Sequence, residues 1–330
     1  LRWLAGLSLV ELMVSIVLGM LLTLGIVSIY LDSKLNYAAD EEVARIQENG
    51  RYALNLLKRE LTLAGFYAGD VTVADMASVA VTTDCAAANW AIDASEPVEL
   101  INNYNNSTLT INGTTLTCLA EGGVVPIEAG TDLVTVKRTA GDFTLKNGGF
   151  QVGVAAAKQE QWYLRRANYG DTKGWAYIGA GGNFPGADRG VNTRVAYWEY
   201  YSRIFFIRNY SNTAGDGIPS LCMKHLVGDD MTTHCLVEGV EDMQVEFGID
   251  TSGDGVPNRF KGAPTAAELS NAVVARVYLL LRSVNEIQDY TNSKTYQLGQ
   301  KAVAAKNDGF FRRVMSTTVQ MRNSNLPLAS

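Results

Sequence analysis

One carboxylate stands inside a long apolar run near the start of the chain. Residues 7–31 contain a single charged side chain, Glu11. A helix of about 20 apolar residues spans the hydrocarbon core of a bilayer, so this run is long enough to cross a membrane. A charge within such a segment costs free energy and marks a candidate functional residue. We therefore expect Glu11 to pair with a positive group.

Acidic and hydroxyl side chains alternate in a turn-rich segment of the second half of the chain. The candidate calcium ligands there are Asp250, Ser252, Asp254 and the carbonyl of Val256. With Gly255 they match the first half of a calcium loop, whose oxygens point at one centre. Lys261 stands where an EF-hand has its glutamate, and Pro257 disfavours the usual continuation, so the segment is not an EF-hand. Two interpretations stay open: a calcium ion completed by Glu246 or Glu268, or a bare Asx-rich turn.

Four cysteines fall into two sequence-local pairs, Cys85 with Cys118 and Cys222 with Cys235. A membrane-anchored chain with its bulk outside the cytoplasm meets an oxidising compartment, where cysteines form disulfides. We expect Cys85–Cys118 and Cys222–Cys235 on this ground. Four cysteines allow three pairings, however, and the sequence does not choose among them.

The two histidines, His225 and His234, lie beside the second cysteine pair. Their spacing fits no zinc template, so a hairpin closed by one disulfide is the simpler interpretation. No nucleophile stands in a recognisable catalytic motif. The formal net charge is −6, whereas nucleic-acid-binding proteins carry clustered positive charge. We expect neither an enzyme nor a nucleic-acid-binding protein, and calcium is the one candidate cofactor.

A single long helix must position Glu11. Beyond the apolar run, apolar residues continue mostly at three- and four-residue steps: Leu35, Ala39, Val43, Ile46, Ala53, Leu56, Leu57 and Leu61. The charged residues between them, which include Glu42 and Glu60, form a polar face and make this segment amphipathic. Gly50 weakens the helix and Gly65 ends it. The helix should run from about Leu7 to Ala64 and be roughly 85 Å long at 1.5 Å per residue. Such a helix is a membrane stem whose outer half packs against a globular head.

The start of the stem, Gly-Leu-Ser-Leu-Val-Glu-Leu from residue 6, resembles the processing site of type IV pilins and pseudopilins. The resemblance implies that a prepilin peptidase cuts after Gly6 and methylates the amine of Leu7. It also implies that Glu11 pairs with the terminal amine of a neighbouring subunit. Residues 1–6 are then a prepilin leader, and Leu7 replaces the family's usual phenylalanine. A cleaved secretory signal does not fit the length of the run, and a simple signal anchor leaves Glu11 unexplained.

Both ends of the chain are similar to PilW-type minor pilins. The similarity lies in residues 48–67 of the stem and in three later runs, 240–245, 276–283 and 312–323. Residues 67–220 are largely unmatched. The resemblance implies a sparse subunit that primes or caps a fibre.

The expected fold class is α+β and type IV pilin-like, with a long N-terminal α-helix on an antiparallel β-sheet and a large β-rich insertion. The stem covers residues 7–64, of which 7–31 are transmembrane, and the head covers 65–330. Strands are expected at 71–73, 79–82, 109–111, 133–137, 194–210, 237–249, 272–282 and 310–323. Residues 221–236 should form a hairpin, 266–272 a short helix, and 169–171, 173–175 and 179–186 loops.

The resemblance implies a minor pilin that primes assembly of a type IV pilus and enters the fibre after processing. Its implied partners are the prepilin peptidase, other minor pilins, the major pilin, a tip adhesin and the inner membrane. The head would stand in the periplasm before assembly and in the fimbrium at the cell surface afterwards, in a fibre for adhesion and twitching motility. One alternative is a minor pseudopilin of type II secretion. The alternative from another class is a membrane-anchored periplasmic binding protein.

Overall fold

The computed structural model describes residues 8–68, 81, 84–85, 89–105, 109–111, 114–120, 123–167, 173–190 and 194–323. Within these ranges the helices are α1 (Leu9–Leu63), η2 (Trp90–Ile92), η3 (Thr117–Leu119), η4 (Gly186–Asp188) and α2 (Ala266–Leu269). The strands of the first half are β1 (Val98–Ile101), β2 (Thr110–Ile111), β3 (Thr114–Thr115), β4 (Leu133–Thr139), β5 (Leu145–Lys146), β6 (Gly149–Phe150), β7 (Gln161–Ala167) and β8 (Gly174–Ile178). Those of the second half are β9 (Val195–Arg208), β10 (Ser220–Val227), β11 (Asp230–Glu238), β12 (Val240–Ile249), β13 (Arg259–Lys261), β14 (Ala272–Arg282), β15 (Tyr296–Leu298), β16 (Lys301–Val303) and β17 (Arg312–Gln320).

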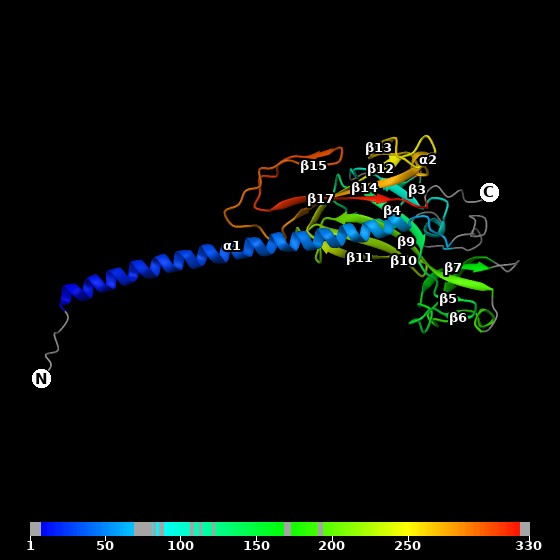
Figure 1. The fold of residues 1–330 in the computed structure, drawn as a ribbon, viewed down its shortest axis with the longest axis horizontal. Coiled ribbons are helices and arrows are strands. Elements are labelled where there is room, and N and C mark those ends of the chain that lie inside the picture. The colour runs from blue at the N-terminus through cyan, green and yellow to red at the C-terminus, as the bar shows by residue number, and fades with distance from the viewer. Residues whose placement is uncertain are drawn as a thin grey trace.

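Helix α1 is a stem of 55 residues whose first portion projects alone from the head (Figure 1). Its described side chains are exposed as far as Ala38, and the first buried one is Glu42, where the helix reaches the head. The helix ends as expected at Gly65, which has a φ of +73° and donates its backbone N–H to Lys137 O at 3.0 Å. A left-handed residue of this kind is the common way to stop an α-helix.

Among the described residues, the head contains two large antiparallel sheets and two small two-stranded ones, β2-β3 and β15-β16. Among the described residues, nine strands form the larger sheet, with the path β1-β4-β9-β10-β11 and with β5 and β7 joined to the first portion of β9. The smaller sheet has the order β13-β12-β14-β17. The predicted α+β fold, with one long N-terminal helix and a β-rich insertion, is confirmed.

The main core lies where α1 meets both sheets. The apolar face of α1, with Leu57 and Leu61 fully buried, packs with Phe205 of the larger sheet and Val277 of the smaller one. Gly50 lies in this face, and a Cβ there would overlap the sulfur of Met315 and press on a neighbouring leucine. The glycine predicted to weaken the helix therefore also allows its close approach to β14 and β17.

The opposite face of the larger sheet carries a second core, built from described residues between Tyr67 and Leu133 and from side chains of β7, β9, β10 and β11. A third, aromatic cluster gathers around Tyr163, Phe184 and Tyr197. It lies at the end of the head remote from the free portion of the stem, with β5, β6 and β7 (Figure 1). The insertion thus adds layers to the larger sheet without displacing α1 from it.

Most predicted strands are present, and one loop prediction is wrong. The aromatic-rich run at 194–210 forms the single 14-residue strand β9, and 221–236 forms the β10–β11 hairpin. Residues 173–175 were expected to be a loop because of Gly174, yet β8 begins there and pairs with β7. The β-forming side chains that follow Gly174 outweigh its turn signal once β7 supplies a partner. Of the strands expected at 71–73 and 79–82, only Val81 lies within the described residues, and it is not in a strand.

Both expected disulfides are present. Cys222 and Cys235 face each other in the register of β10 and β11, with their Cα atoms 3.9 Å apart. Cys85 and Cys118 link two segments of the second core, and Cys118 lies in the short helix η3. One disulfide therefore reinforces a hairpin that the ladder already aligns, and the other joins distant segments of the insertion.

Replacing Cys85 and Cys118 together by alanine should destabilise the protein more than replacing Cys222 and Cys235. The sequence separations are 33 and 13 residues, so the chain-entropy difference is about 1 kcal/mol, out of a cost of roughly 3–4 kcal/mol for each disulfide. Denaturant unfolding of the two double variants shows which of them has the lower free energy of unfolding. Equal stability of the two, or a larger loss for the β10–β11 pair, would show that the insertion does not depend on its cross-link.

Candidate assembly site

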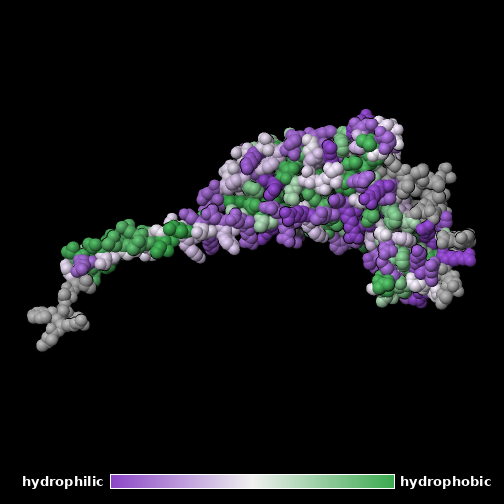
Figure 2. All heavy atoms as spheres, viewed as in Figure 1, coloured by the Kyte–Doolittle hydropathy of each residue, from purple (hydrophilic) through white to green (hydrophobic). Residues whose placement is uncertain are grey.

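The free end of the stem is a bare apolar helix. Among the described residues, α1 is long and apolar enough to cross a membrane, and its most apolar window has no portion buried in the protein. Figure 2 shows this apolar surface along the projecting portion of the stem. Large aliphatic side chains such as Leu22 and Ile29 are more than 60% exposed there. Such a surface needs lipid or other apolar helices around it.

Glu11 lies in the first turn of this helix, with its side chain exposed. Ser15 Oγ donates a hydrogen bond to the backbone carbonyl of Glu11 at 2.7 Å, so this hydroxyl does not bond to the carboxylate. Within the described residues the carboxylate of Glu11 has no ion pair. The predicted processing residues, Gly6 and Leu7, lie outside the described residues. The role of these three residues stays a prediction.

At its other end, the stem is fixed to the head by a buried ion cluster. Glu60 of α1 is 1% exposed and accepts two hydrogen bonds from Arg138 of β4, at 2.9 and 2.7 Å. Arg203 of β9 donates to the same carboxylate at 2.5 Å. Both guanidinium groups also lie over the ring of Tyr201, at 4.8 and 4.3 Å. The cluster joins one side chain of the stem to two strands of the larger sheet.

A second carboxylate of the stem binds the head where burial begins. Glu42 accepts a hydrogen bond from the backbone N–H of Val284 at 3.1 Å and another from Asn285 Nδ2 at 2.8 Å. Glu42 and Glu60 are 18 residues apart, which is five helical turns, so they lie on the same side of α1. They hold both ends of the packed half of the stem.

Glu42 and Glu60 were predicted to lie on the polar face of the stem, and this was wrong. The sequence carried a weak signal, because Glu42 precedes Ile46 by four residues and Glu60 follows Leu57 by three. These spacings put both carboxylates at the border of the apolar stripe. The basic partners of Glu60 come from residues 78 and 143 positions away, and no local pattern identifies them.

The predicted calcium loop closes on itself. Asp250 accepts hydrogen bonds from the backbone N–H groups of Ser252, Gly253 and Gly255, at 2.9, 2.7 and 2.7 Å. These hydrogen bonds lower the pKa of the Asp250 carboxyl, and the bond from Gly255 has the largest effect. Asp254 accepts from the N–H of Val256 at 2.9 Å.

The two distant carboxylates that were to complete a calcium site serve other partners. Glu246 accepts from the N–H of Gln300, and Glu268 from Lys261 and the N–H of Thr265. Among the residues that the structure describes, no three acidic, histidine or cysteine side chains converge on a point suited to a metal ion. Calcium binding at Asp250, Ser252, Asp254 and Val256 stays a prediction.

Replacing Asp250 by alanine should lower the melting temperature in the absence of calcium, because three backbone N–H groups lose their acceptor. Replacing Asp254, which accepts one such bond, is the matched control and should have a smaller effect. Calorimetry with excess calcium and with chelator tests the ion directly. A calcium-dependent rise that disappears in the Asp250→Ala, Asp254→Ala double variant would establish the site. Identical melting temperatures in calcium and in chelator would show that the loop does not bind calcium.

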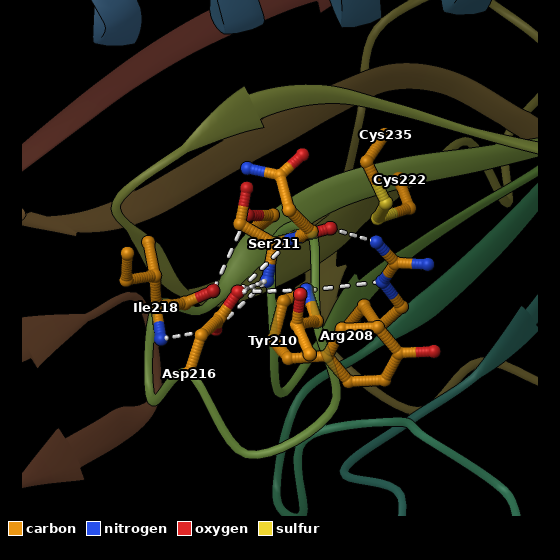
Figure 3. Close-up of a disulfide and its surroundings, with 10 residues drawn as sticks. Arg208, Tyr210, Ser211, Asp216, Ile218, Cys222 and Cys235 are labelled. Carbon is orange, nitrogen blue, oxygen red and sulfur yellow. Dashed lines mark hydrogen bonds between the residues drawn. A yellow bond between two sulfur atoms is a disulfide. The ribbon is translucent and has the colours of Figure 1, made fainter.

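The loop that precedes β10 also closes on the carboxylate of one aspartate (Figure 3). Asp216 accepts from the N–H groups of Ser211, Asn212, Thr213 and Ile218 at 2.9–3.1 Å. Burial raises its pKa, but these four hydrogen bonds outweigh it and set the pKa to about 2. Arg208 Nε donates to Tyr210 O at 2.9 Å and ties the start of the loop to β9. This loop connects β9 to the strand that carries Cys222.

The two histidines lie together on the face of the larger sheet that carries Arg203. The rings of His225 and His234 are 4.8 Å apart, and His225 is the register partner of Arg203. Burial, His234 and Arg203 lower the pKa of His225 to about 4, so its imidazole is neutral at pH 7. The histidines belong to the disulfide-closed hairpin, as expected from the sequence.

Residues 204–323 match the model of the PilW family, described as type IV pilus-assembly protein W. The matched segment begins inside β9, ends just after β17, and contains the whole smaller sheet against which the stem packs. No curated protein and no solved structure matches the chain. The match supports a protein related to type IV pili and, with the apolar helix, a place in the cell envelope.

Proposed function

We propose that this chain is a minor pilin that primes assembly of a type IV pilus and enters the fibre. Prepilin peptidase would cut after Gly6 and methylate the amine of Leu7. Before assembly the stem would anchor the chain in the inner membrane, with the head in the periplasm. Afterwards, Glu11 would pair with the terminal amine of a neighbouring subunit.

The observation that carries the proposal is the continuity of the stem with the matched half of the head. Helix α1 runs unbroken from the bare apolar segment around Glu11 into the main core. There it packs on β14 and β17, which belong to the segment that matches the PilW family. A simple membrane anchor does not need to pack against the head. In a fibre subunit, by contrast, the packing of the stem among other stems fixes the position of the head, so stem and head must be joined firmly.

The partners follow from this proposal. Other minor pilins and the major pilin would supply the helices that cover the apolar stem once it leaves the lipid, because a bare apolar surface of this size is not stable in water. A tip adhesin would be a further partner if the chain lies at the fibre end. Adhesion and twitching motility would depend on the chain through the pilus.

Deletion of the chain from its cell tests the proposal. The expected result is loss or strong reduction of surface pili, measured by shearing and by electron microscopy, with restoration by the wild-type chain. Normal piliation with defective protein secretion would favour the minor pseudopilin of type II secretion. Normal piliation and normal secretion would favour a membrane-anchored periplasmic binding protein.

A further inference from the structure

A lysine and a glutamate are held together in the second core, where both are almost completely buried. The side chains of Lys137 in β4 and Glu99 in β1 are 1% and 3% exposed, and Lys137 Nζ lies 3.3 Å from Glu99 Oε2. Glu99 is the register partner of Thr135, so Lys137 lies diagonal to it on the same face of the sheet. Among the described residues, every other pair of a lysine and a carboxylate is more open, and Lys301 with Asp242 comes nearest at 24% and 8%.

An aromatic ring and two hydroxyl groups lie around this pair. Lys137 Nζ is 4.5 Å from the centre of the Trp90 ring, and Trp90 Nε1 donates a hydrogen bond to Glu99 Oε1 at 3.4 Å. Thr135 Oγ1 donates to the other carboxylate oxygen at 3.1 Å. Ser202 of β9 is the register partner of Lys137, and its buried hydroxyl has no hydrogen-bond partner among the described residues. Removing two charges from water costs free energy that their mutual attraction offsets only in part.

We propose that Glu99 and Lys137 condense into an amide bond that joins β1 to β4 covalently. The two reacting groups are already in contact, and the carboxylate is held by hydrogen bonds on both oxygens. Condensation replaces two buried charges by a neutral amide and so removes the desolvation cost of the ion pair. The amide has one N–H donor, and the unpartnered hydroxyl of Ser202 beside Lys137 accepts it.

The reaction needs only the two side chains and releases one water molecule. Lys137 first transfers a proton to Glu99 across the ion pair, which leaves a neutral amine beside a carboxylic acid. The amine lone pair then forms a bond to Glu99 Cδ, one C–O bond breaks, and the oxygen leaves with its own proton and one from the amine. Trp90 and Thr135 donate hydrogen bonds to the carboxyl oxygens and stabilise the negative charge that develops there. Exclusion of water from the site disfavours hydrolysis of the product.

The amide bond lies where the stem ends on the larger sheet. The backbone carbonyl of Lys137 accepts from the N–H of Gly65 at 3.0 Å, and its N–H donates to the carbonyl of Pro97 at 2.9 Å. A covalent bond at Lys137 therefore joins β1 to the residue of β4 on which α1 ends. It keeps β1 attached when the hydrogen bonds between these two strands break, on heating or under tension along the stem.

Peptide mass spectrometry of the full chain, purified in detergent and digested after reduction of its disulfides, tests the proposal. The expected result is a branched peptide that contains Glu99 and Lys137 and is lighter than the sum of its two parts by one water molecule. Recovery of the two residues only in separate peptides, each at the mass given by its sequence, would overturn the proposal. The wild-type digest decides the question even if a variant fails to fold.

Two variants separate an amide bond from an ion pair. Glu99→Gln should form the same amide with loss of ammonia in place of water, so its branched peptide should have the same mass as that of the wild type. Lys137→Arg keeps the positive charge, but its guanidinium stays protonated and cannot attack, so it should give separate peptides only. Lys301 and Asp242, which are more open to water, are the internal control and should stay unlinked. Linkage of the control pair in comparable yield would show that the bond arises during handling and would overturn the proposal.

Discussion

Glu60→Ala is expected to lower the free energy of unfolding by about 3–5 kcal/mol. The reason is that Arg138, which is itself buried, would lose its bidentate partner, and Arg203 would lose its ion pair. A buried charge without a partner costs far more than a well-paired one contributes. Denaturant unfolding of the full chain in detergent, followed by tryptophan fluorescence, measures the change. Detachment of the stem from the larger sheet should appear as faster proteolysis after Ala64.

Glu48→Ala is the matched control, because Glu48 lies on the same helix but is exposed. Its effect should stay within about 0.5 kcal/mol. The double variant Glu60→Met, Arg138→Met removes both charges and should recover some of the stability lost in Glu60→Ala. If Glu60→Ala unfolds at the same denaturant concentration as Glu48→Ala, the ion cluster does not hold the stem to the head.

The second large effect concerns assembly. Glu11→Ala should leave the head folded and the leader cleaved, but should lower incorporation into pili by roughly tenfold, which corresponds to ~1.4 kcal/mol. After the proposed cleavage, the Leu7 amine of this or a neighbouring subunit would bring a positive charge into apolar surroundings. The attraction of a carboxylate is stronger there than in water, because the effective dielectric constant is lower. Immunoblots of sheared pili and of membranes give the ratio of assembled to unassembled chain directly.

Glu11→Gln tests whether charge matters beyond shape, and it should assemble nearly as poorly as Glu11→Ala. Ser15→Ala, one turn farther along, removes a hydroxyl that bonds only to the helix backbone and should assemble normally. Wild-type amounts of Glu11→Ala in purified pili would contradict a pairing role for the carboxylate.

The sequence allowed the stem and the second half of the head to be predicted because their signals are local. The three- and four-residue steps that continue from Ile46 to Leu61 mark the face of α1 that packs. The long β-rich runs ending at Arg208, Ile249 and Arg282 are each longer than an average strand, and the one breaker residue inside these strands is Gly248, next to the end of β12. Gly65 marked the end of the helix because a left-handed residue is needed there.

The rest depended on partners far away in the chain. Glu60 looked like one more surface charge until β4 and β9 placed two arginines against it. Gly174 looked like a loop until β7 paired with the strand that begins there. In the predicted calcium loop, Asp250 accepts hydrogen bonds from backbone N–H groups of the loop itself, and the structure gives Glu246 and Glu268 other partners. Local patterns identify elements, whereas the partners of buried charges come from the tertiary fold.

Mass spectrometry of the chain recovered from sheared pili is the most direct test that it is a processed pilus subunit. The predicted result is an N-terminal peptide that begins at Leu7 and carries one methyl group on its amine, found in the pilus fraction of the wild type. In a strain without prepilin peptidase, the chain should keep Gly6 and stay in the membrane. A chain that retains Gly6 in the wild type and never reaches the pilus fraction would contradict the account.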